Sequence, residues 1–115
     1  MNQAAGLNAM TTLNCIRRES RTSHGKRYPF FYNPMWSLFG DRTPGAAGTY
    51  YHSKSGHGHF GWNMLDQVLI RPSALPWFGD VRILTMAGSK RLDAKSGRPR
   101  RQNASDHFPI ILELK

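Results

Sequence analysis

Apolar residues in this chain gather in short runs that turn-forming residues separate, and this pattern limits the folds open to it. Three runs are typical of β-strands and a fourth is shorter: Trp62–Ile70, Val81–Met86, Phe108–Leu114 and Thr49–Tyr51. The apolar spacing around residues 7–18 predicts a helix instead. No run reaches the roughly 18 apolar residues that a membrane-spanning helix needs. We therefore expect a mixed α and β fold, with mostly antiparallel strands joined by long loops.

Length and charge set further limits. A chain of 115 residues with 39% hydrophobic residues has room for one small domain, and no internal boundary divides residues 1–115. Lys and Arg outnumber Asp and Glu by 16 to 7, which gives a net charge of +9. Such an excess attracts polyanions such as nucleic acid, phosphorylated lipid or nucleotide, although in many basic proteins it serves only solubility.

The cysteine content and the N-terminus bear on localisation. Cys15 is the only cysteine, so the chain has no internal disulfide, which fits a reducing compartment. Residues 1–10 show no basic flank followed by an apolar run, as a secretory signal would. A cytoplasmic location is the expectation.

Three loops carry residues of interest. The aromatic-rich stretch 20–48 is expected to pack down on a core edge, with a base-stacking rim as the alternative. Histidines at 52, 57 and 59 lie in a glycine-rich loop, where a solvated loop is favoured over a zinc site because no further ligand is nearby. The stretch 88–101 is basic and precedes Asp106 closely. It reads either as a solvated loop or as a clamp on substrate phosphates, through Lys90, Arg98, Arg100 and Arg101.

Three ionisable residues form the candidate catalytic set. Asp106 and His107 stand just before the last apolar run, where a strand tip would let both reach one site. Asp66 interrupts the apolar stretch Trp62–Ile70, and a buried carboxylate needs a partner. His107 is the natural candidate. Such a pair fixes the imidazole tautomer, and an imidazolium directed at a phosphoryl oxygen would stabilise the charge that develops in phosphoester cleavage.

These residues also carry a resemblance. The segment Ser105-Asp106-His107-Phe108-Pro109-Ile110 resembles the S-D-H-x-P-[IV] signature of the endonuclease/exonuclease/phosphatase superfamily, which includes deoxyribonuclease I-like nucleases. The segment Met64–Ile70 resembles the superfamily's preceding strand, an apolar segment with one Asp. The resemblance covers about residues 28–115, the C-terminal half of such a domain.

The resemblance implies a fold and a chemistry. The fold would be part of a four-layer α/β/β/α sandwich, and the activity a metal-dependent attack of water on phosphorus, assisted by Mg²⁺ or Mn²⁺. His107 would contact the scissile phosphate, Asp66 would orient His107, and Asp106 would lie at the metal and phosphate site as a ligand or a support. The substrate would be a phosphoester, nucleic acid among the options.

The chain departs from the superfamily pattern in two respects. Met64 stands where a basic residue is common, and the metal-binding Asn, the metal-binding Glu and the Asp-x-Asn motif have no counterpart. We therefore expect a hydrolase fragment that is inactive without a complementing N-terminal half, and that self-associates when isolated. The rival hypothesis is a basic, non-enzymatic module that binds nucleic acid or another partner. A degenerate relative kept as an interaction domain is a third.

Overall fold

The structure is a computed structural model that describes residues 8–54 and 60–115. Within these residues the fold is mixed, strand-rich and poor in helix, with five two-stranded sheets. The sheets pair β1 (Ala9–Met10) with β4 (Phe31–Tyr32), β2 (Ser20–Ser23) with β3 (Lys26–Pro29), β5 (Tyr50–His52) with β6 (Gly61–Asn63), β7 (Phe78–Ile83) with β10 (Ile110–Leu114), and β8 (Met86–Ala87) with β9 (Lys90–Arg91). The first pair is parallel and the other four are antiparallel. The helical elements are α1 (Leu13–Ile16) and two 3-10 helices, η1 (Pro34–Leu38) and η2 (Pro72–Trp77).

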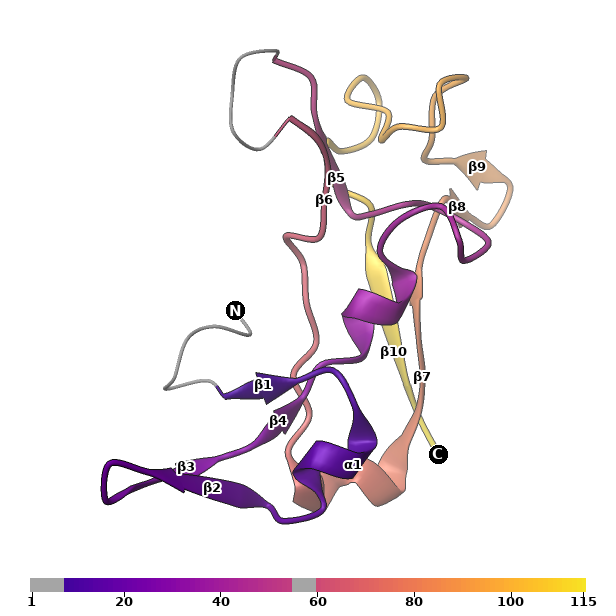
Figure 1. Ribbon diagram of the computed structural model, residues 1–115. Helices are drawn as coiled ribbons and strands as arrows, with labels where there is room; N and C mark the ends of the chain where they lie inside the picture. Colours follow the sequence, from indigo (N-terminus) through magenta and orange to yellow (C-terminus); the bar gives the residue numbers. More distant parts are fainter. Residues whose placement is uncertain (1–7, 55–59) are drawn as a thin grey trace.

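The β7–β10 pair is the longest element pair and runs down one side of the molecule (Figure 1). Ile110 pairs with Ile83 and Leu112 with Val81. Glu113 and Arg82 form an ion pair across the two strands, but both side chains are about half exposed, so it contributes little to stability.

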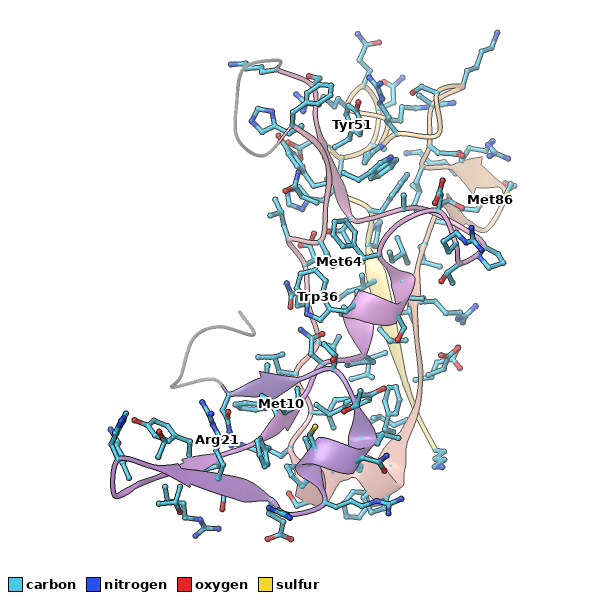
Figure 2. The ribbon with its side chains drawn as sticks, viewed as in Figure 1. Met10, Arg21, Trp36, Tyr51, Met64 and Met86 are labelled. Atoms are coloured by element: carbon cyan, nitrogen blue, oxygen red, sulfur yellow. The ribbon has the colours of Figure 1, made fainter. Side chains whose placement is uncertain are left out.

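The core lies where η1 packs against this strand pair. Met35, Met64 and Val81 are buried together, and Trp36 and Ile110 pack around them. Trp36 and Met64 lie near the middle of the molecule (Figure 2). The 3-10 helix places Met35 inward because the preceding Asn33 side chain accepts a hydrogen bond from its backbone N–H at 3.0 Å.

Several predicted elements have different bounds. The predicted helix at 7–18 shrinks to Leu13–Ile16, because residues 9 and 10 form a parallel strand with residues 31 and 32 instead. The predicted strand Val81–Met86 begins earlier, at Phe78, and ends at Ile83. The last strand begins at residue 110 rather than 108, since Pro109 has no N–H for a sheet.

The predicted strand Trp62–Ile70 is wrong in most of its length. Only Gly61–Asn63 pairs as a strand, and the chain from residue 64 to 69 is irregular. The reason is local. The backbone N–H groups of Leu65 and Asp66 donate to the Thr49 side chain instead of to a neighbouring strand.

The stretch 20–48, predicted to be a loop, contains a β-hairpin. Strands β2 and β3 are joined through His24 and Gly25, whose φ angles are 51° and 73°. Positive φ at both central positions is typical of a type I′ turn, which suits the twist of a two-residue hairpin. This hairpin projects away from the rest of the chain (Figure 1). None of the described helices is long and apolar enough to span a membrane.

Candidate active site

Asp66 and His107 contact each other directly. The Oδ2 atom of Asp66 lies 2.7 Å from Nδ1 of His107, so the predicted contact is confirmed. The side chains are 38% and 37% exposed, which corrects the expectation that the Asp66 carboxylate is buried. A pair this exposed contributes no more than about 1 kcal/mol to stability. Its main effect is therefore to orient the ring and to hold the proton on Nδ1, which leaves Nε2 free.

Thr49 holds the segments that carry these two side chains together. It is fully buried, and its Oγ1 accepts hydrogen bonds from the N–H groups of Leu65 and Asp66 at 3.1 and 3.2 Å. Its backbone carbonyl accepts a hydrogen bond from the N–H of Phe108 at 2.8 Å. One residue before β5 thus fixes both the turn at Asp66 and the backbone next to His107.

His107 is held in place from three sides. Its backbone forms an isolated bridge with Tyr50 of β5, and its N–H donates to Ser105 Oγ at 3.1 Å. The Tyr50 ring lies against the imidazole, with a centroid distance of 5.0 Å. The next residue, Phe108, is buried and stacks on Trp62. The imidazole is therefore anchored by a rigid neighbour in the core, although it is itself partly exposed.

Beside this pair, two arginines are each held by a tyrosine. The guanidinium of Arg98 lies 3.8 Å from the centroid of the Tyr51 ring and donates to the Tyr51 hydroxyl at 3.0 Å. Arg101 donates to the Tyr50 hydroxyl at 3.4 Å. Arginine has five N–H donors, so each guanidinium keeps donors for an anion after making these contacts.

These arginines line a pocket of about 220 Å³ at the end of the molecule where Tyr51 lies (Figure 2). Its lining residues are Tyr51, Ser53, Ser96, Arg98, Pro99, Arg101 and Asp106. Arg98 and Arg101 of the basic stretch thus share a pocket with Asp106, whereas Asp66 and His107 are not among its lining residues. Lys90 and Arg100 do not line it either: Lys90 lies on β9, and Arg100 hydrogen-bonds Leu92 through its backbone.

Asp106 is exposed at the rim of this pocket. Among the described residues, no cluster of three His, Cys, Asp or Glu side chains could hold a metal ion. The donor set that this part of the chain offers therefore does not fit a complete magnesium or manganese site. Two of the three histidines considered for zinc, His57 and His59, lie outside the described residues, and His52 accepts a hydrogen bond from the Lys54 N–H.

The rest of the basic loop is ordered by an internal ion pair. Arg91 donates two hydrogen bonds to Asp93, at 2.9 and 2.7 Å. The side-chain hydrogen bond from Arg91 lowers the pKa of the Asp93 carboxyl, and the same contact raises the pKa of Arg91. Asp93 is the only acid in the stretch 88–101, and Arg91 neutralises its charge. Asp93 therefore does not compensate the positive charge of Arg98 and Arg101.

Sequence reasoning missed the three residues of Thr49–Tyr51 as parts of the site. A threonine before two tyrosines predicts only a short strand. The role of Thr49 in the site depends on its contacts with Leu65, Asp66 and Phe108, which are distant in the sequence. The one signal was indirect: two tyrosines and a run of arginines are a common source of cation–π pairs.

Comparison with models of protein families, with curated proteins and with solved structures finds no match for this chain.

Proposed function

We propose that this chain is the phosphate-handling part of a phosphoester hydrolase of the nuclease or phosphatase type. The observation that carries the proposal is the 2.7 Å contact between Asp66 and His107 beside a pocket lined by Arg98 and Arg101. The S-D-H-x-P-[IV] resemblance supports it, since the same short segment supplies both the imidazole and the pocket's carboxylate, Asp106.

The chemistry follows from the donors. With its Nδ1 proton held by Asp66, His107 presents Nε2 to a ligand, and in the protonated ring this atom donates a hydrogen bond to a phosphoryl oxygen. Arg98 and Arg101 bind the remaining non-bridging oxygens, because planar guanidinium groups match phosphate geometry. Their tyrosine partners hold both groups in place before the substrate arrives, which lowers the entropy cost of binding.

The superfamily resemblance also implies Mg²⁺ or Mn²⁺, for which the described residues supply a single carboxylate at the pocket, Asp106. We propose that the other ligands come from a complementing polypeptide or from sequence joined to this one, together forming the four-layer sandwich. On this proposal the 115-residue chain binds phosphate but does not turn over a phosphoester by itself.

Two measurements test the proposal. The first is binding of inorganic phosphate to the chain by calorimetry. Arg98→Gln should weaken this binding, and the matched control Arg42→Gln, in an exposed loop outside the pocket, should not. Equal binding by wild type and Arg98→Gln would contradict a phosphate site here.

The second measurement is activity after joining the chain to the sequence encoded upstream of it. With Mg²⁺, the joined protein should hydrolyse DNA, RNA or a simple phosphodiester, and His107→Ala should lower the rate by about a hundredfold or more. A joined protein in which His107→Ala changes nothing would favour the non-enzymatic binding module instead.

A further inference from the structure

A second basic surface lies far from the candidate active site. Five cations and one acid, Glu19, occupy the sequence from Arg17 to Arg27, around the β2–β3 hairpin. All five cations are exposed. Arg21 on this hairpin and Tyr51 at the arginine pocket lie at opposite ends of the molecule (Figure 2). The hairpin therefore cannot contribute to the pocket that contains Asp106.

The cations of the hairpin are held in place by their neighbours. Arg21 and Lys26 both lie over the Tyr28 ring, at 6.0 and 5.6 Å from its centroid. Arg27 donates from Nε to Ser20 Oγ at 2.9 Å. These contacts follow from the register, since Arg21 pairs with Tyr28 and side chains at alternate positions share a face. Positive charge is therefore presented on both faces of the ribbon.

A groove extends this surface at the base of the hairpin. It encloses about 630 Å³, and its lining residues are Arg18, Ser20, Arg21 and Thr22 together with Met10, Asn14, Cys15 and Phe30. No acidic residue lines it. Guanidinium and hydroxyl donors are the side chains that most often contact sugar–phosphate backbones.

We infer that the β2–β3 hairpin and its groove form a nucleic-acid-binding arm that contacts the phosphate backbone. A two-stranded ribbon is of a size that a DNA major groove admits. Tyr28 is the one large aromatic side chain of the hairpin, and Arg21 and Lys26 lie over its ring, so the hairpin has little to insert into a lipid bilayer. This favours nucleic acid over a membrane surface. The inference does not require the proposed hydrolase activity.

The test compares two charge-matched double variants of the full chain. Lys26→Gln/Arg27→Gln removes two cations from the hairpin, and Arg42→Gln/Lys115→Gln removes two exposed cations elsewhere. Binding to a short fluorescein-labelled DNA duplex is measured over a series of salt concentrations. Each lost phosphate contact lowers the salt slope by about 0.9, so the hairpin variant should lose about two units of slope and about tenfold or more in affinity. The control should stay close to wild type.

A third variant distinguishes loss of binding caused by lost charge from loss of binding caused by unfolding. Lys26→Arg/Arg27→Lys keeps both charges and should bind like wild type, and the unfolding midpoint of all variants should agree because these side chains are exposed. Unchanged DNA binding by the hairpin variant, or an equal loss in the Arg42/Lys115 control, would overturn the inference. So would a variant that loses binding to phosphatidylserine vesicles while keeping its affinity for DNA.

The inference and the proposed function fail separately. Duplex binding through the hairpin should be present in the isolated chain, for which the proposed function expects no hydrolysis, because the β2–β3 hairpin and the β5–β6 pair lie at opposite ends of the molecule (Figure 1). Hairpin-dependent binding without any hydrolysis by the joined protein would remove the proposed function and leave the arm in place.

Discussion

Thr49 is the residue on which the geometry of the site depends. Its hydroxyl accepts two backbone hydrogen bonds at the turn that carries Asp66, and valine has nearly the same shape without this acceptor. Thr49→Val should therefore lower the free energy of unfolding by about 1–3 kcal/mol, since it leaves two partly buried N–H groups unpaired. Urea unfolding measures this loss. Thr49→Ser keeps the hydroxyl and should recover most of it; equal midpoints for the valine variant and wild type would show that the hydroxyl is dispensable.

The Asp66–His107 contact leads to a prediction about the imidazole tautomer. In the folded chain Asp66 holds the proton on Nδ1, so nitrogen NMR of the neutral His107 ring should show mainly the Nδ1–H form. Asp66→Ala should remove this preference while leaving stability almost unchanged, because the pair is exposed. Asp106→Ala is the control, since Asp106 precedes His107 but lies at the arginine pocket. A tautomer ratio that responds to Asp106 and not to Asp66 would contradict the assignment.

For single residues, the sequence correctly predicted that Asp66 contacts His107, but it was wrong about the surroundings of Asp66. Asp66 was expected to be a buried carboxylate in a continuous strand, and it is a partly exposed side chain at a bend. The pairing could be predicted because both residues carry a recognisable pattern. The bend could not, because it depends on a threonine hydroxyl from another part of the chain.

Among the glycines of the described residues, Gly48, which comes just before β5, has the least room for a side chain. A Cβ atom added at Gly48 would lie 2.7 Å from the Asn63 carbonyl oxygen, which is backbone and cannot rotate away. Gly48→Ala should therefore cost about 1–3 kcal/mol and disturb the Asp66–His107 contact. Thermal melting and the His107 tautomer report the two effects.

Gly25→Ala provides the contrast. Residue 25 faces open space but has a φ of +73°, so alanine there costs only backbone strain of about 1–2 kcal/mol, confined to the hairpin. The His107 tautomer should not change in this variant. If Gly48→Ala also leaves the tautomer unchanged, the entry to β5 does not control the site.

The sequence predicted that strands β7 and β10 exist but not where they begin. The two predicted runs overlap these strands, because Val81–Ile83 and Ile110–Leu114 are rich in aliphatic residues of high β propensity. The hairpin was missed although His24-Gly25 between polar strands is a local turn signal. Its strands have no apolar alternation, so a reading based on hydrophobic periodicity finds nothing there.

At the scale of the whole molecule the chain is extended. Its radius of gyration is 16.3 Å, whereas a compact domain of this length would have about 13 Å. The described strands form only two-stranded sheets, so each sheet has free edges. Both facts fit a chain that needs further structure to complete its core, as the proposed sandwich would provide.

The surface beside β10 leads to the last prediction, that the isolated chain self-associates. Leu112 and Leu114 are 42% and 71% exposed and line an apolar groove of about 300 Å³ with Ile70 and Phe78. Exposed apolar surface next to an unpaired strand edge favours association. Sedimentation should show dimers or larger species, and Leu112→Lys/Leu114→Lys should shift the distribution to monomer without loss of fold, because both side chains already contact water. The control Leu13→Lys/Met86→Lys adds the same charge at exposed positions outside the groove and should leave association unchanged. A wild-type chain that sediments as a single monomer and melts in one cooperative transition would contradict the prediction and show that this fold is stable without a partner.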